Sequence, residues 1–387
     1  MNPTEKIRVA VLYGGRSGEH EVSLVSASNV IQNLDRSRFE VIPIGIDKQG
    51  SWFLGDDVFK QELSHTPAIL RLQRDTDRLL FNPDLIGKSP QQMQIAPSHF
   101  ALTQGARLFD VVFPVIHGPL CEDGSVQGLL ELAEVPYVGC GVLASSVGMD
   151  KDVSKRLAQN AGILTPSYVV VKREHWDLNP EKYCDLVNQK LSYPVFVKPA
   201  NTGSSVGVHK VNGFEQLVTA INDAFRYDTK VLIEQGVDAM EIEVAVLQAL
   251  NASEEPIVSI PGEICPTGAH EFYSYSSKYI DEQGAEIIIP AQLSLELQEK
   301  IRHMAKNIFD ALECEGMARV DLFLERGTHN IYFNEINTIP GFTTISMYPK
   351  LMAASGVSYS ELLTHLVMLA LARHAKKAKL SREYIVE

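Results

Sequence analysis

The 387-residue sequence lacks a surplus of basic residues, since its formal net charge is −13. A broad basic surface, which nucleic acid or an anionic membrane would require, is therefore not expected. The sequence also lacks an apolar run of about 20 residues, the length that spans a bilayer. Its five cysteines are scattered and include no CxxC pair, which indicates neither a disulfide framework nor a zinc site. We expect a cytoplasmic protein without nucleic-acid or membrane partners.

The order of the predicted elements indicates an α/β protein of more than one domain. The chain is too long for a single compact core. It opens with an apolar strand from Ile7 to Tyr13, a glycine turn and a helix from about Glu19, which is how an open parallel sheet begins. The polar segment from Gly55 to Arg107 is interpreted as an insertion. The expected domains are residues 1–139, 140–233 and 234–387.

Two strand-like segments near the C-terminus place polar side chains on one face of a predicted hairpin. A hairpin centred on Thr328 makes Asp321 face Glu335, and Arg319 then faces Asn337 on the same side of the sheet. Two carboxylates and an amide oxygen at cross-strand distance repel one another unless a cation lies between them, and Mg²⁺ fits best. Taken alone, the pattern fits a solvated hairpin face better. The other motifs reverse that preference.

A lysine at the end of an apolar strand precedes a loop rich in glycine and serine. Lys198 is followed by residues 199–207, Pro-Ala-Asn-Thr-Gly-Ser-Ser-Val-Gly. Glycines let backbone N–H groups approach phosphate oxygens, and the lysine adds a mobile point charge. The order differs from that of a P-loop, in which the lysine follows the glycines. A plain surface turn explains the glycines equally well, but it does not explain the lysine.

Two glutamates flank a hinge-like turn at the end of another apolar strand. Glu234 and Glu241 lie on either side of residues 235–237, Gln-Gly-Val. Backbone groups there could meet an adenine, and a carboxylate could meet ribose hydroxyls. Lys151 follows Asp150 at the start of a predicted helix, where a single lysine is usually solvated. Each feature carries little weight by itself.

A histidine lies at the ligand-binding edge expected for the first sheet. His117 follows the carboxyl end of a parallel strand, although a histidine bonded to its own turn explains this position equally well. Glu21 lies on the first turn of the opening helix, where the helix dipole favours it with or without a function. The aromatic segment from Phe272 to Tyr279 fits a lid that excludes water, or a simple surface loop.

These motifs together resemble those of the D-alanine:D-alanine ligases of the ATP-grasp superfamily. The resemblance covers nearly the whole chain in order. It rests on Gly14 to Ser17 with Glu19 to Ser23, His117-Gly118 with Glu122 to Gly124, Met149 to Lys151, Lys198-Pro199 with Gly203 to Gly207, Tyr273 with Lys278-Tyr279, Arg319 to Asp321, and Glu335 to Thr338 with Pro340-Gly341. It implies an α/β, three-domain ATP-grasp fold with an N-terminal open parallel sheet, and ATP bound between the central and C-terminal domains.

The resemblance implies that ATP phosphorylates the carboxylate of one D-alanine and that the amine of a second D-alanine attacks the acylphosphate. The products are D-alanyl-D-alanine, for peptidoglycan precursors, together with ADP and phosphate. Asp321, Glu335 and Asn337 would hold two Mg²⁺ ions, with Mn²⁺ as a possible substitute. A homodimer is also expected. The residues implied to contact ATP are Lys151, Lys198, Ser205, Glu234, Gln235, Val237, Glu241 and Lys278.

The family resemblance also implies how the amino-acid substrates are held. Arg319 and the backbone N–H of Gly341 would form an oxyanion hole, because charge grows on the carbonyl oxygen during attack. Glu21 would receive the ammonium group of the first substrate, and His117 would lie near its carboxylate. The residues implied to meet the carboxylate of the second substrate are Ser346 and Met347.

A hydrogen-bonded trio of Glu21, Ser204 and Tyr279 is implied to latch the lid over the site. Because a tyrosine at the position of Tyr279 accompanies dipeptide formation in the family, we predict D-alanyl-D-alanine rather than D-alanyl-D-lactate. Departures from the family pattern remove no charge assigned to catalysis, and affect lid motion and affinity instead. They are Cys121, Ser274, Ser276 and Met347.

Two alternative functions compete with this interpretation. Another ATP-grasp ligase, acting on a different small amino acid or hydroxy acid, would keep the lysines, Arg319 and the magnesium ligands but change Glu21, Tyr279 or Ser346. A binding or regulatory protein on a former ligase scaffold would lose Asp321, Glu335 or Arg319, because desolvated charges cost stability without their ligand. All six of these residues are present, which favours the ligase.

Overall fold

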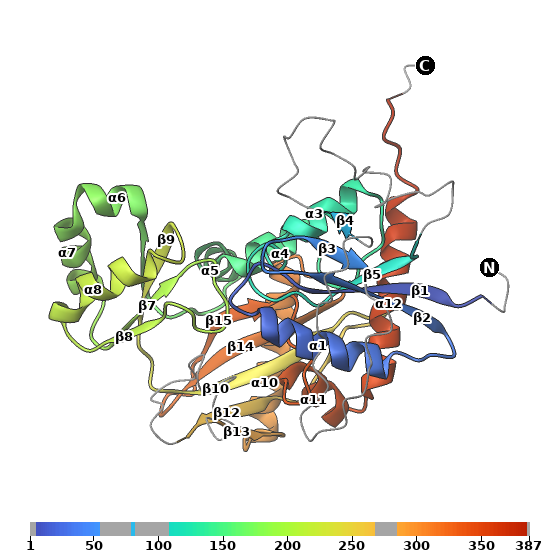
Figure 1. Ribbon diagram of the computed structural model, residues 1–387. Coiled ribbons are helices and arrows are strands. Elements are labelled where there is room, and N and C mark those ends of the chain that lie inside the picture. The colour runs from blue at the N-terminus through green and yellow to red at the C-terminus, as the bar shows by residue number, and fades with distance from the viewer. Residues whose placement is uncertain (1–4, 55–78, 82–107, 268–284, 385–387) are drawn as a thin grey trace, which may run out of the picture.

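The computed structural model describes residues 5–54, 79–81, 108–267 and 285–384, which form three sheets with flanking helices (Figure 1). Most of the predicted insertion and the whole predicted lid lie outside these residues. The expectations for Lys278 and Tyr279 therefore stay predictions. Among the described helices, none combines the length and the apolar character needed to cross a bilayer.

The N-terminal sheet is the open parallel sheet expected from the sequence, extended by an antiparallel edge. Its elements are β1 (Ile7–Gly14), α1 (His20–Asn33), β2 (Phe39–Ile46), β3 (Trp52–Leu54), β4 (Leu79–Phe81), β5 (Val111–Pro114) and α3 (Ser125–Leu132). The strand order is β4-β3-β2-β1-β5, with β1 parallel to both of its neighbours. β1 is the central parallel strand, and its nearly unbroken apolar sequence suits burial on both faces.

Glycine is required where β1 turns into α1. Gly14 has a φ of +92°, and a Cβ at this position would lie 2.1 Å from the carbonyl oxygen of Ile46. The Gly14 N–H donates to Ser23 Oγ at 2.8 Å, so the first turn of α1 is tied back to the strand. This turn brings the N-terminus of α1 to the carboxyl end of the sheet, which is where such sheets bind ligands.

A Gly14→Ala variant should lose at least about 2 kcal/mol of stability, because alanine meets both an unfavourable φ and a backbone clash. Gly18→Ala is the matched control, since no atom lies within 4 Å of the added Cβ there. Thermal unfolding of the two variants measures the difference. Equal midpoints would mean that the turn can relax around a Cβ.

The central sheet is a four-stranded antiparallel layer with the order β6-β9-β7-β8. Its elements are β6 (Tyr168–Lys172), α6 (Arg173–Leu178), α7 (Pro180–Lys190), β7 (Val195–Pro199), β8 (His209–Val211), α8 (Phe214–Ala224) and β9 (Lys230–Gln235). Trp176, Val187 and Leu217 of the helices share a core with inward residues of the strands. Figure 1 shows this layer and its helices as one end of the molecule.

The C-terminal sheet is antiparallel, with the order β13-β12-β10-β14-β15 and β11 beside β10. The elements that build it and cover it are α4 (Val142–Met149), α5 (Lys151–Asn160), β10 (Ala239–Leu247), β11 (Ile257–Val258), β12 (Gly262–Pro266), β13 (Ala285–Ile288), α10 (Leu295–Ala311), β14 (Met317–Glu325), β15 (Ile331–Asn337), α11 (Met347–Ala354) and α12 (Tyr359–Lys377). Ile242 and Val244 of β10 pack with α10 on one face, whereas Ala245 and Leu247 pack with α11 and α12 on the other.

The predicted hairpin register is confirmed at the polar face. Asp321 pairs with Glu335, and Arg319 pairs with Asn337. Beyond Asp321 the register shifts by one residue, so Leu322 lies opposite Phe333 and Asn334 is the extra residue of a β-bulge. The bulge therefore lies directly beside the two paired carboxylates.

The domain limits at 139/140 and 233/234 stay predictions, and some elements pack outside the domain predicted for them. Helices α4 and α5 pack against β15, because Ala144 and Ala158 share a core with the C-terminal sheet. Strand β9 runs through the second limit, because Lys230–Gln235 pairs along its length with β6 and β7. Helix α12 packs on α1 and β5, which joins the C-terminal sheet to the N-terminal one.

Candidate active site

A cleft of about 730 Å³ lies between the central and C-terminal sheets. The central sheet lines it with residues of β7, β8 and β9, and the C-terminal sheet with residues of β10, β12, β14 and β15. This is the position expected for ATP. The residues predicted to contact ATP or metal that line the cleft are Lys151, Lys198, Ser205, Glu234, Gln235, Val237, Glu241, Asp321 and Glu335.

One arginine holds the carboxylates on the C-terminal sheet together. Arg319 Nε and Nη2 donate to the two carboxylate oxygens of Asp321, each at 2.7 Å. Asn337 Nδ2 donates to Asp321 Oδ2 at 2.9 Å. Sequence reasoning missed Glu243, whose Oε2 lies 2.9 Å from Arg319 Nε. The signal for it is strand pairing, because Glu243 lies opposite Asp321 on the neighbouring strand β10.

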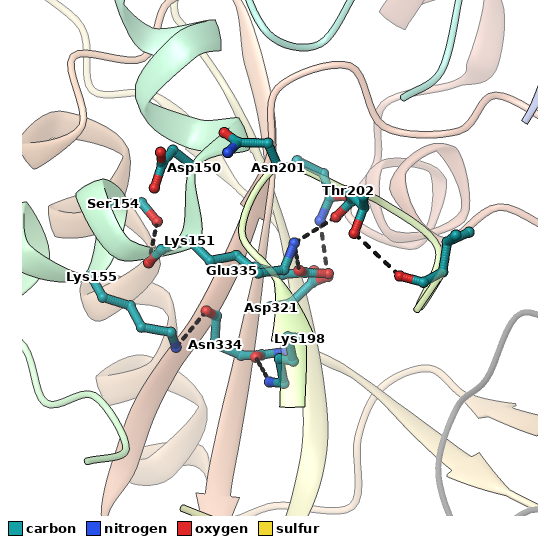
Figure 2. A network of polar contacts seen from close by, with 12 residues as sticks. Asp150, Lys151, Ser154, Lys155, Lys198, Asn201, Thr202, Asp321, Asn334 and Glu335 are labelled. Atoms are coloured by element: carbon teal, nitrogen blue, oxygen red, sulfur yellow. Dashed lines mark hydrogen bonds and ion pairs between the residues drawn. The ribbon is translucent and has the colours of Figure 1, made fainter. Parts of the chain in front are cut away.

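Lys151 connects the loop after β7 to Glu335, the carboxylate that pairs with Asp321. Its Nζ lies 3.1 Å from Glu335 Oε2 and donates to the carbonyl oxygen of Thr202 at 2.7 Å (Figure 2). The start of α5 sets this direction, because Asp150 caps the helix by accepting from the backbone N–H groups of Asp152 and Val153. The side chain thus points into the cleft rather than into solvent, as Figure 2 shows.

The residues present fit a magnesium ion that is completed by phosphate. Among the described residues, no group of three or more His, Cys, Asp and Glu side chains forms a ready metal cage. Mg²⁺ rarely needs one, because it usually binds through one or two carboxylates, several waters and substrate phosphates. Asp321 and Glu335 supply two opposed carboxylates on adjacent strands, and Asn337 adds an amide beside them.

A buried ion-pair cluster of Lys155, Glu234 and Lys198 lies beside the cleft, which Glu234 and Lys198 line. Lys198 Nζ lies 2.6 Å from Glu234 Oε1, and Lys155 Nζ lies 2.8 Å from Glu234 Oε2. Burial alone would raise the pKa of Glu234, but the two lysines hold it below its usual value. Sequence reasoning missed Lys155, although its spacing was informative, since it lies one turn after Lys151 on α5.

The ion-pair cluster bears on the ATP contacts predicted at the hinge. The Glu234 side chain is only 2% exposed, and both of its carboxylate oxygens pair with lysines. Gln235 and Val237 line the cleft beside it, and Glu241 lines the cleft from β10.

The predicted contact between Glu21 and Ser204 is wrong, because Ser204 Oγ donates to Glu19 instead. Glu21 is 65% exposed at its side chain and pairs with Lys48 at 2.5 Å, and this hydrogen bond lowers the pKa of Glu21. Glu19 is the N-cap residue of α1, whereas Glu21 lies on its first turn. Of the two glutamates Glu19 is the buried one, at 7% exposed.

Three segments converge on the Glu19 carboxylate. A Cβ at Gly118 would lie 2.8 Å from Glu19 Oε2, and a Cβ at Gly203 would lie 2.9 Å from it. The carboxylate therefore meets the loop after β5 and the loop after β7. This is a junction of the N-terminal and central units, and the hydrogen bond from Ser204 to Glu19 spans it.

His117 is buried at the same edge of the N-terminal sheet. Its Nε2 lies 3.0 Å from Ser26 Oγ, and its Nδ1 lies 3.5 Å from Glu122 Oε1. Burial opposes protonation, but the neighbouring Glu122 carboxylate raises the pKa of His117 above its usual value. A histidine whose pKa is raised in this way is suited to lie near a substrate carboxylate.

The segment before α11 holds Gly341, predicted for the oxyanion hole, and Ser346, predicted for the second substrate. Ser346 Oγ accepts from the Thr343 N–H at 3.0 Å, and a Cβ at Gly341 would lie 2.6 Å from this oxygen. Gly341 and Ser346 are therefore adjacent. The Met347 side chain is buried in the core that joins α11 and α12, so only its backbone is left to meet a substrate.

The fold and this cleft define an enzyme of the ATP-grasp class. Two antiparallel sheets face each other across the cleft, with Lys198 on the central sheet, the paired carboxylates on the C-terminal sheet and Lys151 at the start of α5 between them. Solved structures with the same arrangement are D-alanine ligases of that class. The structure of the D-alanine–D-alanine ligase from Coxiella burnetii matches with a TM-score of 0.76 at 33% identity, covering 97% of each chain.

The family models place the chain more narrowly. Residues 8–140 match the model described as D-ala D-ala ligase N-terminus, and residues 157–368 match that described as D-ala D-ala ligase C-terminus. The D-alanine–D-alanine ligase A of Bradyrhizobium diazoefficiens is 54% identical over 384 residues, which cover 98% of this chain and 99% of that protein. The VanG D-Ala:D-Ser ligase from Enterococcus faecalis matches with a TM-score of 0.74 at 35% identity, covering 95% of this chain and all of that one. The chain belongs to the D-alanine–D-alanine ligase family.

Proposed function

We propose that this cleft joins two D-alanine molecules into D-alanyl-D-alanine at the expense of ATP, as a step toward peptidoglycan precursors. The observation that carries the proposal is the meeting of Lys151 and Lys198 with the paired carboxylates Asp321 and Glu335 in one cleft between two sheets. The matches over the full length of the chain support it.

The two lysines neutralise the phosphate oxygens of ATP during transfer of the γ-phosphoryl group. A carboxylate oxygen of the first D-alanine attacks the γ-phosphorus, and ADP leaves. Asp321, Glu335 and Asn337 would hold Mg²⁺, or Mn²⁺ in its place, which supplies Lewis-acid neutralisation of phosphate charge when bound. Lys151 is already close to this set, because its Nζ lies 3.1 Å from Glu335.

The amino-acid substrates lie toward the junction of the N-terminal unit. Glu19, rather than Glu21, receives the ammonium group of the first D-alanine, because its carboxylate is buried where three segments meet. His117 faces the carboxylate of this substrate. Ser346 and the backbone of Met347 meet the carboxylate of the second substrate.

Attack by the second substrate completes the reaction. Its amine nitrogen bonds to the carbonyl carbon of the acylphosphate, the amine loses a proton, and phosphate leaves as the tetrahedral intermediate collapses. Arg319 and the Gly341 N–H stabilise the oxyanion of that intermediate. Arg319 is held by Glu243 and Asp321, so its guanidinium is preorganised before substrate binds.

Phosphate release from ATP and Mg²⁺ tests the proposal. D-alanine alone should give release and a product with the mass of the dipeptide. L-alanine should give none, and D-alanine with D-lactate or D-serine should still give D-alanyl-D-alanine. D-serine is included because one solved relative is a D-Ala:D-Ser ligase. No release with D-alanine would overturn the proposal, and a mixed product would move the acceptor assignment to another substrate.

Two further assignments accompany the proposed reaction. We place the enzyme in the cytoplasm, an assignment supported by its cysteines, all five of which are unpaired. The family resemblance also favours a homodimer. Sedimentation of the purified protein measures that state.

A further inference from the structure

The Lys155 ammonium is surrounded by oxygen atoms of two different sheets. Its side chain is 0% exposed. Its Nζ lies 2.8 Å from Glu234 Oε2 on β9, and donates to the carbonyl oxygens of Asn334 at 2.8 Å and Phe333 at 3.2 Å on β15. Figure 2 shows the side chain reaching Asn334 from α5. A lysine in this position connects the two sheets that form the cleft.

The β-bulge explains why two successive carbonyls reach the same ammonium. In a regular strand, successive carbonyl groups point to opposite edges. At Asn334 the register shifts, and the carbonyls of Phe333 and Asn334 both meet Lys155. Bulges of this kind re-aim side chains near active sites. Here the next residue is Glu335, which is paired with Asp321 at the proposed metal site.

The same ammonium also shapes the environment of Lys198. Glu234 is shared between Lys155 and Lys198, so the ion-pair cluster carries one net positive charge instead of closing into a neutral pair. Lys198 Nζ also donates to Asn334 Oδ1 at 3.4 Å. Lys198 and Lys155 thus contact the same bulge residue, one at its side chain and the other at its carbonyl oxygen. Lys155 does not line the cleft, whereas Lys198, Asn334 and Glu335 do.

We propose that Lys155 is a positioning residue for the nucleotide and its metal, acting through Glu234 on Lys198 and through the Asn334 bulge on Glu335. It touches neither ligand. This inference rests on the proposed function only in placing ATP and Mg²⁺ in the cleft. Replacing a residue that orients a ligand-binding side chain without touching the ligand typically lowers metal affinity or activity by about 10- to 100-fold.

A Lys155→Met variant tests the role, because it keeps the length of the side chain and removes the charge. Arg156→Met is the matched control, since Arg156 is the next residue on α5, is 61% exposed and forms its ion pair with Asp152, one turn earlier on the same helix. We expect Lys155→Met to raise the KM for ATP and the half-saturating Mg²⁺ concentration by about tenfold or more. The KM for D-alanine should change less than about twofold, and Arg156→Met should match the wild type.

Nucleotide binding without turnover separates positioning from folding. The rise in melting temperature that ADP and Mg²⁺ produce is measured for each variant, with no D-alanine present. Lys155→Met should show a smaller rise at every ADP concentration. Because this readout needs no ligation, it stays valid even if D-alanine proves to be the wrong substrate.

A double variant covers the case in which Lys155→Met does not fold. Lys155→Met with Glu234→Gln removes both charges of the buried pair, and such neutral replacements often cost little stability. If the double variant regains the wild-type melting temperature but responds to ADP less than Glu234→Gln alone, the positioning role stands. If it regains that temperature and responds to ADP as Glu234→Gln alone does, or if Lys155→Met melts early yet keeps wild-type ATP and Mg²⁺ dependence, Lys155 only neutralises Glu234 and the inference is overturned.

Discussion

A Glu335→Gln variant should lose magnesium-dependent ATP turnover by about 1,000-fold or more while it keeps its fold. Glu335 is the carboxylate opposite Asp321, and it is also the partner of Lys151 at 3.1 Å. The amide has nearly the same shape but no charge, so it no longer neutralises the charge of Mg²⁺ and it leaves Lys151 uncompensated. A factor of ten in rate corresponds to about 1.4 kcal/mol, so losing several kcal/mol of charge stabilisation lowers the turnover rate by about 1,000-fold or more.

The measurement combines initial rates with Mn²⁺ binding followed by electron paramagnetic resonance in the presence of ADP. Glu325→Gln, at the far end of the same hairpin, is the control. Its carboxylate accepts from Asn330 at 3.1 Å in the exposed loop, away from the cleft. We expect the control to stay within about twofold of the wild type. Wild-type Mn²⁺ affinity in Glu335→Gln would move the metal site away from β15.

The hairpin register could be predicted because two simple constraints agree there. The polar loop between the two apolar segments fixes a centre, and the two-residue period of a strand then decides which side chains share a face. A bulge is harder to foresee from sequence. Asn334 takes the extra position, and its carbonyl is held by Lys155, which lies far away in the sequence.

The wrong choice between Glu19 and Glu21 shows the limit of reasoning from helix patterns. Glu19 precedes α1 and Glu21 lies in its first turn. The apolar spacing of α1 does not show which of these side chains points toward the central sheet and its loops. That direction depends on the loops after β5 and β7, which approach Glu19 at Gly118 and Gly203. Long-range packing of this kind leaves no local signal.

Buried charge is the other property that the sequence concealed. Lysines on helices are usually solvated, so neither Lys151 nor Lys155 stood out by itself. In the structure both point inward from α5, and each meets a carboxylate of a strand. Residues four apart on a helix share a face, so the function predicted for Lys151 could have suggested that Lys155 also points toward the cleft.

A Glu19→Gln variant should raise the KM for the first D-alanine by about 10- to 100-fold, whereas Glu21→Gln should leave it unchanged. The carboxylate of Glu19 is buried and accepts a hydrogen bond from Ser204, and it is the group proposed to receive the substrate ammonium. A hydrogen bond to a charged group contributes about 1.5–3 kcal/mol, which corresponds to that change in affinity. Glu21 pairs with Lys48 on the surface, and exposed pairs of this kind contribute little.

The two glutamates make a sharp comparison because they lie two residues apart and differ mainly in direction. Initial rates at varied D-alanine, with ATP and Mg²⁺ saturating, give the KM of each variant, and thermal unfolding shows whether each is folded. An unchanged KM in Glu19→Gln together with a raised KM in Glu21→Gln would restore the assignment made from the sequence. It would also require α1 to turn on substrate binding, since the described structure holds the Glu21 side chain 65% exposed beside Lys48. A raised ATP requirement in Glu19→Gln would instead mean that its bond to Ser204 shapes the phosphate loop of residues 199–207 more than it holds the amino acid.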